Sequence, residues 1–466
     1  MTDPCTGNRS AQEVEWHDVQ ALLRWGLQPF RHSCVLVITF DAAASAARLR
    51  TWLGQQLGSI TAARDDLYPR ANDVGKATNI AISASGLARC GFKDDDLAWF
   101  PREFVAGMSS PRAAKVLGDG GNSHPGTWQW GHGAARADAL LLLFSNDPGL
   151  LASSIRAAQA ALQGLGWTDA IRTWQEDYEP FGFRDGISNP AIRGAKSGRA
   201  TWADGATVEP GEFVFGYADE RGLSPVSPSI AEHRTTVPLP IVVEDTRRKD
   251  LGRNGSLLVV RQLRQDRVAF DDYTQPQKDH GLLAAKMMGR WQNGTPLALS
   301  PTRALPALAT ANEFGYADDR GGDRCPLGAH IRRGNPRDSL GQDGRKSLTN
   351  VDMHRILRRG RVYGAPRRVH GRHLERGIMF MCFNVSLSRQ FEHVQQTWIN
   401  NPRFAAIDET DPVIGNRCTG HDRFTVGYSP TADTHSGLAD FVRTVGGEYF
   451  FFPGLTALRA ISNLVV

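Results

Sequence analysis

The sequence has no hydrophobic run long enough to cross a membrane. Its longest apolar stretches, such as 35–40 (VLVITF) and 139–144 (ALLLLF), have six residues, whereas a spanning helix needs about 20. The N-terminus also lacks the basic start and apolar core of a secretory signal, and it has no twin-arginine export motif. We therefore expect no membrane partner and a cytoplasmic location.

Cysteine is scarce and scattered, and no C-x-x-C pair occurs. The six cysteines are Cys5, Cys34, Cys90, Cys325, Cys382 and Cys418. This spacing argues against a zinc ribbon and against a disulfide framework. We expect reduced, mostly buried thiols, with thiolate ligation of a haem by Cys325 or Cys382 as a minor alternative.

The net charge of +5 is small but unevenly spread. The arginine-rich segment, 355–376, holds eight arginines and a single acid, Glu375. It fits a solvated basic loop, or a pocket for haem propionates beside a surface that attracts anionic substrates. Nucleic-acid binding ranks last, because no aromatic residues of the stacking kind are interleaved with the arginines.

Length and pattern favour two α+β domains. The chain has 466 residues, of which 41% are hydrophobic and 22% charged, as in a folded globular protein too long for one ordinary core. The first half predicts a strand at 35–40, a helix at 41–57 with Asp41 as N-cap, a strand at 77–86, and a strand followed by a helix within 139–166.

The second half repeats this order without detectable sequence identity. It predicts strands at 255–266 and 377–387 and helices at 277–291 and 388–400, the last one capped by Ser388. Two copies of this order suit antiparallel sheets packed with helices, and a ferredoxin-like arrangement is the simplest such fold.

Two turn-rich regions, 175–235 and 319–376, interrupt this pattern. Long loops in a compact protein are often functional. The first contains GFRDGISNP (182–190), where Gly182 and Gly186 bracket Asp185. Glycines on either side of an acid permit unusual dihedral angles and leave room for a cofactor plane, although the spacing alone favours a plain Asp-Gly turn.

The second region contains CPLGAHIRRGNPRDS (325–339). His330 stands between small apolar residues and is followed by Arg332, Arg333 and Arg337. An imidazole followed by arginines suits a haem, whose iron takes a neutral nitrogen and whose propionates take cations. A structural histidine is the alternative, and the competing candidates for ligation are His280, His354, His370 and His393.

Arg358 and Glu392 complete the set of candidates. Arg358 follows the apolar pair Ile356 and Leu357, so we expect it to point inward and to stabilise negative charge. Glu392 lies in a predicted helix, where its side chain is either partly buried or an ordinary exposed acid.

Taken together, these motifs resemble the dye-decolorising peroxidase family. The resemblance rests on GFRDG, GEFVFGY (211–217), MGRWQNGTPL (288–297), CPLGAHIRRGNPR (325–337), ILRRGRVYG (356–364) and the stretch 375–400, in this order. AHIRR-x-NPR followed by RRG-x-x-YG is the specific part. The stretches 338–354 and 365–373 depart from the family pattern, which puts the reducing-substrate surface in doubt.

The resemblance implies two ferredoxin-like domains of the dimeric α+β barrel type, with boundaries at 1–205 and 206–466. It implies haem b in the second domain, with His330 as the iron ligand and Arg337 as a propionate partner. Asp185, in its loop with Gly182 and Gly186, and Arg358 would act on the peroxide. Glu392 would orient the imidazole of His330.

The implied activity is that of a haem peroxidase. It would use hydrogen peroxide to oxidise dyes, phenols or other aromatic one-electron donors, anionic ones included, through an oxyferryl intermediate. A haem carrier or iron-releasing protein of the same fold is the alternative. Self-association into a homo-oligomer is left open.

Overall fold

The computed structural model describes residues 13–67, 75–195, 207–275, 281–364, 375–427 and 432–465. A nine-stranded antiparallel sheet organises the molecule, in the order β10-β16-β2-β3-β1-β4-β12-β13-β11, and a further pairing of β10 with β13 closes it into a barrel. Its strands are β1 (His32–Phe40), β2 (Lys76–Ile82), β3 (Ala139–Ser145), β4 (Gly166–Trp174), β10 (Ser256–Gln265), β11 (Leu357–Arg358), β12 (Arg361–Gly364), β13 (Arg376–Asn384) and β16 (Val442–Phe452).

The two halves of the chain contribute similar four-stranded groups. The order β4-β1-β3-β2 comes from the first half, and β12-β13-β10-β16 comes from the second. Short seams join them, namely the single pair Phe451 with Ile82 and a two-residue pairing of β12 with β4. The antiparallel α+β fold is as predicted. The predicted boundary between residues 205 and 206 falls in 196–206, outside the described residues, and stays a prediction.

The apolar strands bury side chains on both faces. In β1, Cys34, Leu36 and Ile38 pack in the cluster that includes helices α2 (Ala46–Gln56), α7 (Pro148–Ala161) and α13 (Leu455–Ser462). The alternate residues Val35 and Val37 join the cluster of α1 (Ala21–Trp25). Burial on both faces explains the nearly continuous apolar runs in the sequence. Smaller helices complete this part of the chain: α3 (Ala84–Arg89), α4 (Asp94–Leu97), α5 (Arg102–Ala106) and α6 (Pro111–Leu117).

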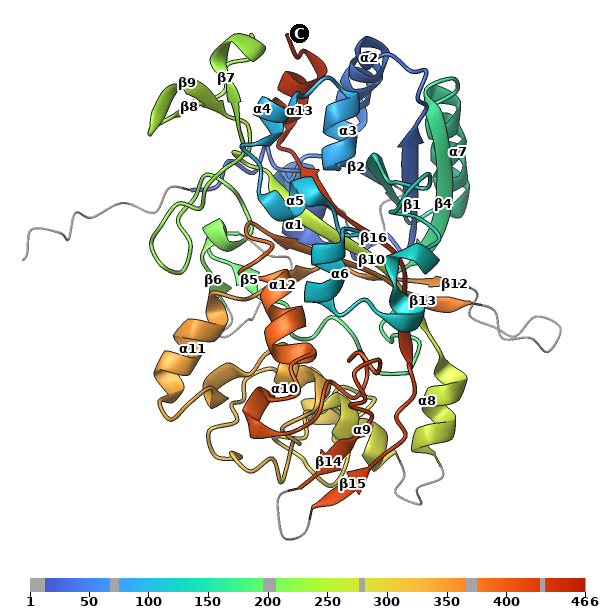
Figure 1. Cartoon of the computed structure of the whole chain (residues 1–466), viewed down its shortest axis with the longest axis vertical. Helices are drawn as coiled ribbons and strands as arrows, with labels where there is room; N and C mark the ends of the chain where they lie inside the picture. Colours follow the sequence, from blue (N-terminus) through green and yellow to red (C-terminus); the bar gives the residue numbers. More distant parts are fainter. Residues whose placement is uncertain are drawn as a thin grey trace, which may run out of the picture.

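A layer of short helices and loops lies on the side of the sheet away from α2, α7 and α13, in the lower half of Figure 1. It contains α8 (Arg267–Thr274), α9 (Leu282–Met288), α10 (His330–Gly334), η9 (Arg337–Ser339), α11 (Gly344–Asp352), α12 (Phe391–His393), the π-helix η10 (Val394–Ile399), η11 (Phe404–Ala406), β14 (Phe424–Val426) and β15 (Asp433–His435). Outside both layers, β7 (Ser229–Ala231), β8 (Ile241–Val242) and β9 (Asp245–Asp250) form a small separate sheet, and β5 (Ala191–Ile192) pairs with β6 (Thr207–Val208).

Two predicted helix starts are wrong. Ser45 rather than Asp41 caps α2, because Asp41 accepts the N–H of Ala43 in a turn that precedes the helix. The helix predicted from Ser388 begins at Phe391. Oε1 of Gln390 accepts the backbone N–H groups of Val385 and Ser386 and so holds the chain in a turn before the helix.

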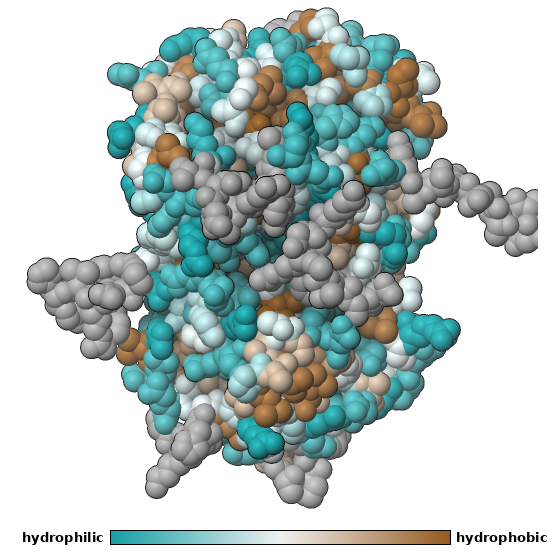
Figure 2. Space-filling view, turned by 180° about the vertical axis from the view of Figure 1, so that it is seen from behind, coloured by the Kyte–Doolittle hydropathy of each residue, from teal (hydrophilic) through white to brown (hydrophobic). Residues whose placement is uncertain are grey.

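No helix among the described residues is long and apolar enough to span a membrane. On the face shown in Figure 2, hydrophilic residues alternate with small groups of hydrophobic ones.

Candidate active site

His330 is the first residue of α10, and its ring lies in the wall of a cavity beneath the sheet. Its Nδ1 lies 2.9 Å from Oδ2 of Asp411, a fully buried carboxylate. The other oxygen of Asp411 accepts the backbone N–H groups of Val413 and Ile414 at 2.8 and 2.9 Å. An acceptor at Nδ1 favours the tautomer protonated there and leaves the lone pair of Nε2 free for a metal.

The ionised form of Asp411 is strongly favoured. Burial alone would raise the pKa of this carboxyl, but His330, the N–H of Ile414 and the charge of Arg333 outweigh it and hold the pKa below its ordinary value. Arg333 also fixes the surroundings, because it donates to the carbonyls of Trp398 and Glu409 and so ties α10 to the loop of Asp411.

The predicted role of Glu392 is wrong. Its carboxylate receives both guanidinium nitrogens of Arg112, at 3.2 and 3.1 Å, and the hydroxyl of Tyr449 at 3.1 Å. It is 2% exposed and turned toward α6 and β16. Asp411, which lies 81 positions beyond His330 and carries no local motif, occupies the place that we had assigned to Glu392.

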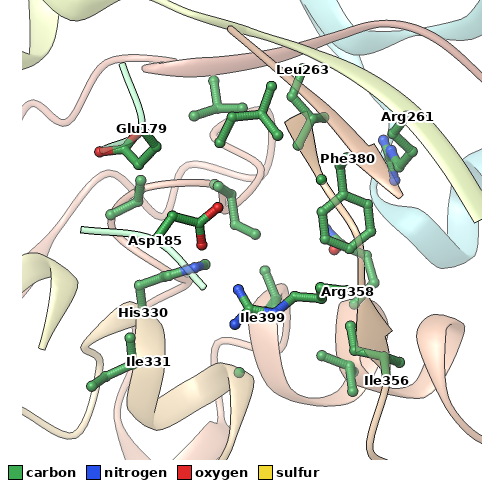
Figure 3. A pocket seen from close by; sticks show the side chains of 18 of the residues that line it. Glu179, Asp185, Arg261, Leu263, His330, Ile331, Ile356, Arg358, Phe380 and Ile399 are labelled. Carbon is green, nitrogen blue, oxygen red and sulfur yellow. The ribbon is translucent and has the colours of Figure 1, made fainter. Parts of the chain in front are cut away.

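Asp185 lies in the loop that follows β4. Gly182 and Gly186 both adopt positive φ, of 92° and 77°, as their flanking positions predicted. The Asp185 N–H donates to Asp177 O at 3.0 Å, and Oδ1 accepts the N–H of Gly186 at 2.6 Å. The carboxylate faces the cavity (Figure 3).

Arg358 reaches the same cavity from the opposite wall. It ends β11, where it pairs with Cys382 of β13, and its backbone N–H is bonded to Asn189 Oδ1. Leu357 beside it packs in the apolar cluster of α1, and Arg358, as the next residue of the strand, points to the other face, where the cavity lies, as predicted. Figure 3 shows Asp185, His330 and Arg358 directed at one common space.

That space is a cavity of about 340 Å³. Its apolar walls include Leu263, Ile378, Phe380, Phe391, Val413 and Ile414.

Several arginines line the cavity, among them Arg337 and Arg290. Arg337 donates to the carbonyls of Asn312 and Phe314 and stacks on the Phe314 ring at 3.9 Å. Arg290 nearby was not predicted. Burial, with the charge of Arg337, lowers its pKa to about 10.

Arg332 and Arg333, which follow His330 most closely, do not reach the cavity. Arg332 pairs with Asp319, and Arg333 bonds backbone carbonyls; both are buried and neither lines the space. They hold the polypeptide around His330. Of the three arginines that the sequence suggested for the propionates, only Arg337 lies where it could contact them.

The arginine-rich segment is not a solvated loop where the structure describes it. Arg359 donates to the carbonyls of Leu22 and Leu23, and Arg361 to those of Leu27 and Phe30. These bonds satisfy carbonyls in and after α1. Residues 365–374 of the segment lie outside the described residues.

The alternative iron ligands fit less well. Cys325 and Cys382 are fully buried and do not line the cavity, and burial raises the pKa of Cys325 to about 12, so it stays a thiol. His354 also lines the cavity, but its ring stacks on His393 at 3.8 Å and its Nδ1 bonds the carbonyl of Arg389, whereas His330 has a carboxylate partner. His280 and His370 lie outside the described residues.

Glu179 was not singled out from the sequence. Its carboxylate lies in the cavity wall near Asp185 (Figure 3). Burial raises its pKa, and the charge of Asp185 adds to that effect, against the N–H donors of Phe181, Gln265 and Phe183.

No protein-family model matches the chain. Among curated proteins, it is 28% identical to a dye-decolorizing peroxidase of Mycetinis scorodonius, over 91% of this chain and 84% of the relative. It is also 28% identical to the multifunctional dye peroxidase of an Amycolatopsis species, over 91% of this chain and 92% of the relative.

Solved structures agree with these relatives. An ancestral D-type dye-decolorizing peroxidase matches 96% of this chain and 99% of its own, with a TM-score of 0.77 and 25% identity. The peroxidase of Auricularia auricula-judae shares the fold at a TM-score of 0.78 and 24% identity, over 97% of this chain and all of its own. With the sequence relatives and the shared fold in agreement, the chain belongs to the dye-decolorising peroxidase family and is a peroxidase.

Proposed function

We propose that this peroxidase binds haem b through His330 and activates hydrogen peroxide with Asp185 and Arg358. The observation that carries the proposal is the His330–Asp411 pair, set in the wall of the cavity that Asp185 and Arg358 also face.

The cavity suits the cofactor of this family, whose members are haem enzymes. Its apolar walls match a porphyrin plane, and Nε2 of His330 is the free nitrogen donor. Arg337 and Arg290 would hold the propionates. Haem, if bound there, would supply the iron centre at which hydrogen peroxide, the two-electron oxidant, is reduced.

The chain's own residues would handle protons and charge. Asp185 would accept the proton from one peroxide oxygen and return it to the other, so that the O–O bond breaks heterolytically. Arg358 would stabilise the anionic peroxide and the departing hydroxide through its guanidinium N–H groups. Asp411 would increase the electron donation of His330 by accepting its Nδ1 proton.

The reducing substrates would be aromatic one-electron donors. A dye-decolorizing peroxidase with the same fold has been solved with 2,6-dimethoxyphenol, so we propose small phenols and dyes, anionic ones included. Homo-oligomer formation and a cytoplasmic location remain predictions from the sequence.

One experiment separates this function from that of a haem carrier. The absorption spectrum of the purified, haem-loaded protein is recorded before and after one equivalent of hydrogen peroxide, and then after addition of 2,6-dimethoxyphenol. A peroxidase changes its Soret band within the mixing time and recovers it with the donor. Slow bleaching alone would support the carrier.

A further inference from the structure

The carboxylate of Glu179 closes the loop that carries Asp185. Its Oε2 accepts the backbone N–H of Phe181 at 3.0 Å, and its Oε1 accepts that of Phe183 at 2.9 Å. The backbone of Glu179 adds two bonds, from its own N–H to Phe183 O and from the Gly182 N–H to its carbonyl. Both carboxylate oxygens are therefore used to hold the turn that precedes Asp185.

A side chain of the sheet fixes this loop in place. Gln265, the last residue of β10, donates its amide to Glu179 Oε2 at 2.7 Å. Glu179 thereby connects the rigid end of a barrel strand to a segment of irregular backbone. Other bonds also hold the loop, among them those from the Arg184 N–H to Gln292 O at 2.9 Å and from the Asp185 N–H to Asp177 O at 3.0 Å, but neither of these two connects it to a barrel strand.

The aromatic side chains of Phe181 and Phe183 hold the loop against helix α8. The ring of Phe181 stacks on Phe270 of α8 at 4.4 Å, and Phe183 meets the same ring edge-on at 6.3 Å. Apolar stacking restrains distance but leaves a ring free to slide, whereas two N–H bonds to one carboxylate fix the direction of the backbone. Asp185 follows two residues after Phe183, so this direction sets the aim of its carboxylate.

From this geometry we infer that Glu179 is a positioning residue for Asp185, which it aims into the cavity through the N–H groups of Phe181 and Phe183. The inference rests on the proposed function of Asp185. Glu179 itself would not touch peroxide, because its oxygens are engaged by these donors and by Gln265.

The test uses Glu179→Gln, which preserves size but turns an NH₂ group toward one of the two backbone N–H groups. Glu176→Gln is the matched control, because the Glu176 carboxylate pairs with Arg376 and, among the described residues, makes no hydrogen bond to residues 180–186. Misplacement of a catalytic group by about 1 Å lowers rates by roughly 100-fold. We expect a 10- to 100-fold fall in the rate constant for peroxide, with the haem spectrum retained.

Two further readouts separate positioning from a general loss of structure. In the Asp185→Asn background, Glu179→Gln should cause no further loss, because both changes act through one carboxylate. In the haem-free protein, hydrogen exchange at the amides of Phe181 and Phe183 should become at least 10-fold faster, while the control is unchanged. If Glu179→Gln does not fold, Gln265→Met is judged by the same criteria.

An equal fold-loss in both backgrounds, an unchanged peroxide rate or unchanged amide exchange would each overturn the inference. Failure of the proposed function is a separate result, since wild-type enzyme would then not react with peroxide although the exchange effect would persist.

Discussion

The bond between His330 and Asp411 can be tested one residue at a time. Asp411→Asn keeps an oxygen for the N–H groups of Val413 and Ile414 but presents an NH₂ group to Nδ1 of His330. Loss of such a second partner weakens metal binding by roughly 10- to 100-fold. We expect haem affinity to fall by this factor and the reduction potential of the iron to rise, measured by haem titration and redox potentiometry.

Glu392→Gln is the control for this change. It disturbs the contacts with Arg112 and Tyr449 but not the imidazole. A loss of haem affinity in Glu392→Gln with none in Asp411→Asn would restore the assignment made from the sequence.

Arg358 is tested through charge. Arg358→Leu should retain haem and slow the reaction with peroxide by about 100- to 1,000-fold, the usual cost of removing one donor to a developing anion. Stopped-flow absorption measures the rate. Arg264→Leu, which removes an exposed arginine of β10 outside the cavity, should leave it unchanged. Normal peroxide kinetics in Arg358→Leu would remove Arg358 from the mechanism.

At the scale of elements, the barrel strands were the most predictable part. β1 and β3 follow from apolar runs, since burial on both faces requires nearly every side chain to be apolar. β10 and β13 lie largely within the strands predicted at 255–266 and 377–387. Helix starts were less predictable, because Asp41 and Ser45 are both acceptable caps and only the local turn decides between them.

The site could be predicted only in part, because a local motif does not show which distant segments of the chain it will contact. Asp185, His330 and Arg358 stand in distinctive local motifs, and the structure directs all three at one cavity. Asp411 comes from an irregular loop far along the chain, so only the folded chain brings it to His330. Glu392 was misplaced because sequence periodicity indicates that a side chain is buried, but not which partner it meets.

Helix α8 supports the Asp185 loop, and one substitution measures this support. Phe270→Ala removes the ring against which Phe181, Phe183 and Phe441 pack. Truncation of a buried phenylalanine typically lowers the free energy of unfolding by about 3–5 kcal/mol, which denaturant titration would show. Val268→Ala on the exposed face of α8 should cost far less. Equal costs would show that α8 does not pack on the loop.

At the scale of the whole molecule, Glu448 of β16 makes stability depend on pH. Burial raises its pKa from 4.5 to about 7. The folded state therefore favours the protonated acid, and the free energy of unfolding falls as pH rises from about 4.5 to about 7, by at most roughly 3 kcal/mol at 1.36 kcal/mol per pKa unit.

Glu448→Gln keeps the oxygen that accepts the N–H groups of Met108 and Tyr449 and cannot ionise. The difference in unfolding free energy between pH 5 and pH 8 should therefore shrink. It should not vanish, because burial raises the pKa of Glu212 to about 7 as well. An unchanged difference would show that Glu448 is not buried as described, and Glu232→Gln, an exposed acid, is the control.

The proposed peroxidase activity depends on His330 as the iron ligand. The most direct measurement is a haem titration of His330→Ala beside wild type, followed by the Soret band with and without added imidazole. We predict that the variant loses tight haem binding and the wild-type spectrum, and that imidazole restores the spectrum in part. Wild-type affinity and an unaltered spectrum in His330→Ala would contradict the account.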